Sequence, residues 1–302
     1  MDIAKALPVK KYAQALQHSR TQEWRDKRDQ AIADINVWLK TPDINRDLAP
    51  ALWDSYGKDG TTVKWLLRAA GIDFQPLSID CGGELPPHWL CVPEIDKYFS
   101  DVRPTIWYRT EKRFIEIVQD VLYWGRLNDV RKKTGELIDF FDLGALHDEV
   151  DYQCNGRFLL EYAGGIEAQN VVYFCGYRAA EQMDRYYEIQ RMGLWQRHKM
   201  ADPDVYSYRG LPIGRWRDID VWALLASENV PVSPLYSMHE VPQHGGKHAF
   251  PRTQYYCHAW GFNSNYVRWL QRYFPAQLKE IMDTFPEVRE KFVTNERTRL
   301  RG

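Results

Sequence analysis

Residues 53–62 read WDSYGKDGTT, a polar turn between a short apolar run, LAPALW (residues 48–53), and a segment whose apolar residues have helical spacing. The apolar face of that segment carries Val63, Leu66, Leu67 and Ala70. Gly71 is the expected helix end. A turn that leads from a strand into a helix exposes unpaired backbone N–H groups at the positive end of the helix dipole. We therefore expect this turn to bind an anion.

The residues of the turn suit a phosphate. Gly57 lets the backbone approach a ligand closely, and Lys58 supplies a compact positive charge. Ser55 and Thr61 add hydroxyl donors. Asp59 stands at the helix start, where it can cap free N–H groups or orient a magnesium ion held by the phosphates. The motif is short, and an ordinary capped turn is the alternative interpretation.

Length, charge and cysteine content limit the number of domains, the partners and the location that we expect. The chain has 302 residues, 44% of them hydrophobic, which allows one large α/β domain or two small ones. The formal net charge of -1 offers no global field for a polyanion, so any nucleic-acid contact must be local. No run of about 18 apolar residues occurs, and we expect no membrane contact. The five cysteines include no CxxC pair, which favours a reducing, cytoplasmic location.

Strand and helix patterns alternate along the chain. Three runs resemble strands that follow LAPALW, namely residues 74–80, 102–107 and 170–178. Helical patterns separate them, and this βαβαβα order is typical of a parallel sheet with helices on its faces. Asp218 is the expected N-cap of a later apolar helix.

The expected domain organisation follows from these patterns. Residues 1–45 form an N-terminal helical segment, with an amphipathic helix from residue 21 to residue 40. Residues 46–240 form a nucleotide-binding α/β domain with a polar insertion at about 126–169. Residues 241–302 form a C-terminal lid and helices broken at Pro275 and Pro286.

Four segments carry a family resemblance. SYGKDGTT resembles the SGGKDS-type pyrophosphate loop of the PP-loop nucleotide α-hydrolase superfamily. SIDCGGELP (78–86), CGYRAAEQMDR (175–185) and LPIGRWRDIDVWALLASENVPVSPLY (211–236) resemble motifs of its phosphoadenosine phosphosulfate (PAPS) reductase branch. The four segments occur in family order between Leu52 and Tyr236.

This resemblance implies a fold, a ligand and a set of site residues. The fold is α/β, with a Rossmann-like, mostly parallel five-stranded sheet, helices on both faces, and extra N- and C-terminal helices. The ligand is ATP or PAPS with Mg²⁺. The residues expected to hold the phosphates are Ser55, Tyr56, Gly57, Lys58, Asp59, Gly60, Thr61 and Arg178. Asp80 and Gly82 correspond to the segment that lines the nucleotide pocket, and Lys58, Asp59 and Arg178 are the expected catalytic residues.

The sequence departs from the reductases of that family. Their C-terminal Glu-Cys-Gly-x-His segment is not found, since this sequence closes with NERTRLRG, and Cys257 does not match its context. The leading hypothesis is therefore the superfamily's shared step, in which ATP is cleaved between its α and β phosphates and AMP passes to an acceptor. A sulfonucleotide reductase and a non-catalytic nucleotide-binding subunit are the alternatives. PAPS reductase-like proteins of phages and mobile elements resemble this chain, which suggests a ParB-like protein partner; a homodimer is left open.

Two further features have open interpretations. Cys81 follows Asp80, and it is either a nucleophile or sulfur carrier or, as we favour, a buried inert thiol. One late segment gathers His239, His244, His248, Cys257 and His258. A metal site is conceivable there, but Gly245, Gly246 and Lys247 favour a lid over the nucleotide, and we predict no metal ligands.

Overall fold

The structure is a computed structural model that describes residues 1–80, 82–110, 112–113, 115–116, 161–164, 169–181, 183–199, 206–238, 241–242, 248–249, 264–285 and 289. The chain divides into two compact units. The first comprises residues 1–79, 86–108 and 157–237, and the second comprises residues 80–85, 109–156 and 238–302.

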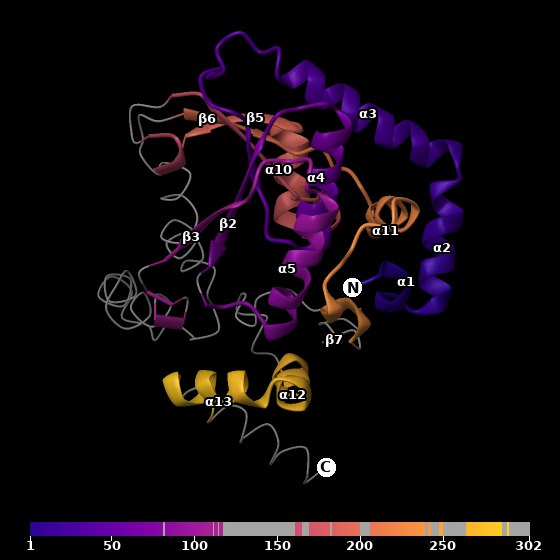
Figure 1. The fold of residues 1–302 in the computed structure, drawn as a ribbon, viewed down its shortest axis with the longest axis vertical. Coiled ribbons are helices and arrows are strands. Elements are labelled where there is room, and N and C mark those ends of the chain that lie inside the picture. Colours follow the sequence, from indigo (N-terminus) through magenta and orange to yellow (C-terminus); the bar gives the residue numbers. More distant parts are fainter. Residues whose placement is uncertain are drawn as a thin grey trace. The chain divides into compact units, whose positions relative to one another are not determined.

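A six-stranded sheet in the order β3-β2-β1-β4-β6-β5 forms the centre of the fold (Figure 1). Its strands are β1 (Ala51–Trp53), β2 (Gln75–Asp80), β3 (Ile106–Arg109), β4 (Val171–Cys175), β5 (Trp195–Lys199) and β6 (Tyr206–Gly210). β1 pairs in parallel with β2 and with β4, and β4 pairs in parallel with β6. These pairings confirm the α/β class and the mostly parallel sheet.

The sheet has six strands rather than the expected five. No sequence pattern was expected to form β6 or β5. β5 lies at the edge of the sheet and pairs antiparallel with β6. Its sequence, WQRHK, has no alternation of apolar and polar residues, so the pattern did not indicate a strand. The third strand also begins later than the expected residue 102, at Ile106. Pro104 lacks an N–H group and cannot join the strand ladder, which accounts for the later start.

Four helices of the first unit follow its strands along the chain. They are α4 (Lys58–Ala69), α5 (Pro86–Tyr98), α10 (Met183–Met192) and α11 (Asp218–Ser227), with the short 3₁₀ turns η2 (Ala179–Glu181) and η3 (Pro234–Ser237). Gly71 follows α4 with φ +70°, a left-handed conformation that glycine adopts readily, and the predicted helix end is therefore confirmed. The predicted N-cap of α11 is wrong by one residue. Arg217 holds that position, because the Asp220 side chain accepts its backbone N–H, and Asp218 begins the helix.

Three N-terminal helices pack on this framework. They are α1 (Ile3–Ala6), α2 (Val9–Ser19) and α3 (Gln22–Trp38), and α3 agrees with the helix predicted for residues 21–40. The Thr21 side chain caps α3 by accepting from the Trp24 N–H. The Trp24 ring is buried, and its Nε1 donates to the Asp220 carbonyl at 3.0 Å. Figure 1 shows α11 between α2 and α4, and α11 contacts both helices.

Strand residues alternate between the two faces of the sheet. Ala51, Leu77 and Val171 form one buried cluster with Ala163, from a segment that precedes β4. Leu52 and Phe174 occupy the intervening strand positions and are fully buried as well. Both faces are therefore covered, which a central parallel sheet requires.

Within the described residues of the second unit, the structure gives bounds for two short strands and two helices. These are β7 (Val241–Pro242), β8 (His248–Ala249), α12 (Ser264–Tyr273) and α13 (Pro275–Thr284). Pro275 opens α13 at a position where its missing N–H has no helical partner, so the predicted break there is confirmed. Pro286 and most of the predicted insertion lie outside the described residues. Across the described part of the chain, no helix combines the length and the apolar character that crossing a bilayer demands.

Candidate phosphate-binding site

The loop between β1 and α4 is shaped by a buried carboxylate. Asp54 accepts a hydrogen bond from the Tyr56 N–H at 2.8 Å, and its second oxygen lies 3.0 Å from Lys64 Nζ. Both side chains are buried, with 0% and 2% exposed. Tyr56 has φ +51°, a left-handed backbone that glycine adopts more readily. The hydrogen bond from the Tyr56 N–H to Asp54 helps to hold this conformation and sets the path of the loop into α4.

The Tyr56 side chain explains why a tyrosine occupies this position. Its ring stacks on Trp107 with centroids 5.3 Å apart. Its hydroxyl lies 2.7 Å from both Asp96 and Thr105. The ring is therefore fixed in the interior, where burial raises the pKa of the phenol. Because the Tyr56 N–H donates to Asp54, this residue shapes the loop rather than offering a group to a phosphate.

The N-terminus of α4 lies against the end of β4. A Cβ atom on Gly176 would come within 2.6 Å of the Asp59 carbonyl carbon and 2.7 Å of the Gly60 nitrogen. Only a glycine allows this approach of two backbones. The Lys58 N–H donates to the Tyr236 hydroxyl at 2.9 Å. The next two N–H groups of the helix, from Asp59 and Gly60, have no acceptor within the helix and suit an anion.

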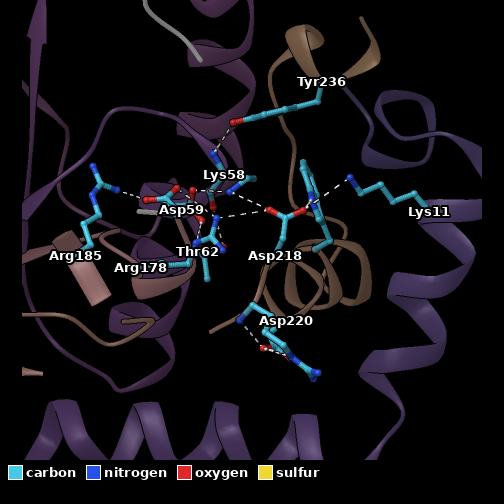
Figure 2. A network of polar contacts seen from close by, with 12 residues as sticks. Lys11, Lys58, Asp59, Thr62, Arg178, Arg185, Asp218, Asp220 and Tyr236 are labelled. Carbon is cyan, nitrogen blue, oxygen red and sulfur yellow. Dashed lines mark hydrogen bonds and ion pairs between the residues drawn. The ribbon is translucent and has the colours of Figure 1, made fainter. Parts of the chain in front are cut away.

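Charged side chains from three elements converge at this helix start (Figure 2). Lys58 Nζ lies 2.6 Å from one Asp59 oxygen, and Arg178 Nε lies 2.7 Å from the other. The Arg178 contact is an ion pair without hydrogen-bond alignment, since neither atom has a hydrogen-bond partner within the described residues. Asp218 Oδ1 lies 3.3 Å from Lys58 and 3.5 Å from Arg178. The structure thus brings the three predicted catalytic residues together.

Electrostatics favour the charged forms of Arg178 and Asp218. Burial by itself would lower the pKa of Arg178, but Asp59, Glu181 and Asp218 outweigh it and raise that pKa. Burial would raise the pKa of Asp218, yet Lys58 and Arg178 bring it below its usual value. The side chains of Lys58 and Arg178 are only 10% and 4% exposed. The site therefore holds two cationic side chains that are largely shielded from solvent.

The remaining predicted residues have varied environments. Ser55 is exposed, whereas Gly57 is half-buried and Gly60 is buried. Thr61 is buried, and its hydroxyl has no hydrogen-bond partner in the described part of the chain. A buried hydroxyl in this state is not presented to a ligand from solvent.

Asp80 and Gly82 belong to the second unit. One Asp80 oxygen accepts from Arg109 Nε and Nη2, at 2.9 and 2.7 Å. The other oxygen accepts from the Gly82 N–H at 3.3 Å, and Gly82 has φ +69°. These contacts define a tight turn after β2. Its role at the nucleotide remains a prediction.

Magnesium is a poor match for the donors seen at the loop. Both Asp59 oxygens face cations, and so does Oδ1 of Asp218. A search of the described residues finds no group of three or more His, Cys, Asp or Glu side chains able to hold a metal ion. In this arrangement the cations suit an anionic ligand, and the carboxylates do not suit a magnesium ion. The predicted role of Asp59 in orienting Mg²⁺ therefore has no support from this geometry.

Three residues at the site were not expected there. Asp218 was considered only as a helix cap, and Tyr236 only as part of a motif. Lys11, on α2, lies 3.8 Å from Asp218 Oδ2. Local patterns carry no signal for such contacts, because the residues are far from the loop in sequence. Cys81, the side chains from His239 to His258, and the proposed lid at 245–247 lie outside the residues whose side chains the structure describes.

Comparison with known proteins identifies related sequences and folds. The family model for the phosphoadenosine phosphosulfate reductase domain matches residues 50–264, a range that includes the loop and Arg178. A stretch of 53 residues is 38% identical to sulfate adenylyltransferase subunit 2 from Caulobacter sp. (strain K31), and it covers 18% of this chain and only 17% of that protein.

Two solved structures are similar to this chain at low sequence identity. A phosphoadenylyl-sulfate reductase from Candida auris, in a phosphate complex, has a TM-score of 0.42 and 12% identity over 71% of this chain and 90% of that chain. The U34-tRNA thiolase NcsA from Methanococcus maripaludis, with its 4Fe-4S cluster, has a TM-score of 0.43 and 13% identity over 88% of this chain and 80% of that chain.

Proposed function

The chain belongs to the phosphoadenosine phosphosulfate reductase domain family, and from this premise we propose that it binds ATP at the start of α4 and transfers AMP to an acceptor. The observation that supports this proposal best is that Lys58 and Arg178 both contact Asp59 at a helix N-terminus. These two cations come from different strand ends and are 120 positions apart in sequence. Such an arrangement favours a ligand with clustered negative charge.

Each group has a defined part in the proposed reaction. The backbone N–H groups of Asp59 and Gly60, together with the helix dipole, hold phosphate oxygens. An acceptor oxygen attacks the α phosphorus and loses its proton, while the bond from the α phosphorus to the bridging oxygen breaks. Pyrophosphate leaves with the bonding electrons. Lys58 and Arg178 stabilise the charge that gathers on it.

The geometry around the described cysteines bears on the reductase alternative. Burial raises the pKa of Cys91 to about 11 and that of Cys175 to about 11. Thiols in this state are poor nucleophiles at neutral pH. Neither Cys91 nor Cys175, the two described cysteines, is thus a candidate for thiol-based sulfonucleotide reduction.

A binding role without turnover is the second candidate. The partial match to a protein named as a subunit of sulfate adenylyltransferase favours a partner-dependent activity. A partner protein, of ParB-like or other type, would then supply the acceptor or complete the site. This candidate predicts ATP binding by the isolated chain without formation of AMP.

The test combines binding with product analysis. Isothermal titration calorimetry measures the affinity for ATP, and phosphorus NMR follows the release of AMP and pyrophosphate. Lys58→Ala and Arg178→Ala should each weaken ATP binding by at least about tenfold, the effect of losing a charge-assisted contact. Lys10→Ala, which removes an exposed lysine of α2, is the control and should bind as the parent chain does.

The outcomes separate the proposals. ATP binding with release of pyrophosphate supports adenylyl transfer, whether water or another acceptor takes the AMP group, and binding without release of pyrophosphate supports the subunit role. If ATP affinity is unchanged in both Lys58→Ala and Arg178→Ala, the assignment of this site is wrong.

A further inference from the structure

Asp218 connects the phosphate site to the N-terminal helices. Its Oδ1 faces both site cations, at 3.3 Å from Lys58 and 3.5 Å from Arg178. Its Oδ2 accepts from Trp222 Nε1 at 2.8 Å and lies 3.8 Å from Lys11. Figure 2 shows Asp218 between Lys11 on one side and the Lys58–Arg178 pair on the other. One carboxylate therefore interacts with cations from three separate elements.

In this position Asp218 competes with any bound phosphate for Lys58 and Arg178. An anion that binds Lys58 and Arg178 must replace the Asp218 carboxylate or sit beside it, and like charges at that distance repel. The side chain is 45% exposed, so water can solvate the carboxylate once it is displaced. A displaced Asp218 retains Lys11 as a nearby partner, because that lysine faces its other oxygen.

We propose that Asp218 is an internal counter-anion that sets the phosphate affinity of the site, and that Lys11 tunes this affinity by drawing the carboxylate away. The inference rests on the proposed function, because it assumes that Lys58 and Arg178 hold phosphate. Lys11 precedes residue 50, where the family match begins, so this device uses a part of the chain outside the matched domain.

Asparagine is an informative replacement for Asp218. Its side-chain oxygen can still accept from Trp222 Nε1, so the helix start keeps its main neutral contact. The negative charge is removed, which leaves Asp59 as the remaining carboxylate partner of both cations, with Glu181 beside Arg178, and abolishes the repulsion between residue 218 and the ligand. Both effects act in the same direction, toward tighter binding.

The experiment is a double-mutant cycle on the intact chain with inorganic pyrophosphate as the probe. Calorimetry at low ionic strength and without divalent metal measures the Kd of the parent chain, Asp218→Asn, Lys11→Met and the double variant. Asp218→Asn should lower the Kd by up to about fivefold, the size of one partly exposed ion pair. Lys11→Met should raise the Kd about twofold or more in the parent background and have no effect in Asp218→Asn.

Controls keep the cycle interpretable. Lys10→Met, on the same helix, removes an exposed lysine and should leave the Kd unchanged. Thermal unfolding confirms that each variant is folded, and Asp218→Ala, which also removes the charge, should shift the Kd in the same direction as Asp218→Asn.

Distinct results would overturn distinct parts of the reasoning. Equal or weaker binding by Asp218→Asn, with Lys58→Ala still impaired, would refute the counter-anion and leave the proposed function standing. An equal loss from Lys11→Met in both backgrounds would show that Lys11 touches the phosphate directly. Absence of pyrophosphate binding in the parent chain and in Asp218→Asn would overturn both the inference and the proposed function.

Discussion

Gly176 offers the sharpest test of how the fold builds the site. A Cβ atom at this position would stand 2.6 Å from the Asp59 carbonyl carbon, where ordinary contacts begin at 3.4 Å, a shortfall of 0.8 Å. The neighbouring atoms belong to the backbone and cannot rotate away. We therefore expect Gly176→Ala to push the first turn of α4 away from the end of β4.

The magnitude follows from this displacement. Overpacking of this kind costs about 1–3 kcal/mol, which corresponds to a melting temperature roughly 2–12 °C lower for a domain of this size. Arg178 follows Gly176 by two residues, so the shift also separates Arg178 from Lys58 and Asp59. Loss of one charge-assisted contact costs about 1.5–3 kcal/mol, or roughly 10- to 100-fold in Kd for ATP.

Gly164→Ala is the matched control for stability. Gly164 has φ +85°, and a Cβ atom there would have no neighbour within 4 Å. The substitution should cost about 1–2 kcal/mol of backbone strain while leaving the loop untouched. Calorimetry with ATP and thermal unfolding are measured for both variants. If Gly176→Ala binds ATP as tightly as Gly164→Ala does, the close approach of β4 and α4 does not shape the site.

Three further predictions concern stability. Lys64→Met leaves the Asp54 carboxylate buried without its ion-pair partner and should cost about 3–5 kcal/mol in denaturant unfolding; a loss below about 1 kcal/mol would contradict the buried pair. Tyr56→Phe removes two hydroxyl hydrogen bonds and should lower the free energy of unfolding by about 1–3 kcal/mol, and an unchanged melting temperature would argue against them. Burial would raise the pKa of Asp220, but contacts led by the hydrogen bond with His18 lower it. The ionised Asp220 therefore stabilises the folded state above the unfolded-state pKa of about 4. This stabilisation is lost as the pH falls through the lower folded-state pKa. In Asp220→Asn the melting temperature should therefore fall less steeply between about pH 5 and 2 than in the parent chain. An equally steep fall would show that Asp220 does not cause the loss of stability in acid.

Much of the fold could be read from local sequence. The turn after β1, the helix end at Gly71 and the start of α13 at Pro275 each depend on the backbone preferences of a few adjacent residues. The residues of the proposed phosphate loop were identifiable for the same reason, because a turn into a helix start needs glycine and offers N–H groups wherever it occurs. The edge strand β5 was not, since its polar sequence becomes a strand only through its pairing with β6.

The sequence by itself determined the first four strands, the turn into α4 and the arginine after β4, because these are properties of contiguous residues. Only the tertiary structure decided that Asp218, Tyr236 and Lys11 join that turn, and that the Tyr56 ring is held in the interior. These contacts link residues up to 207 positions apart, as in the Lys11–Asp218 pair. The packing of α11 against α2 and α4 brings them together, and no local pattern encodes which distant charges will meet.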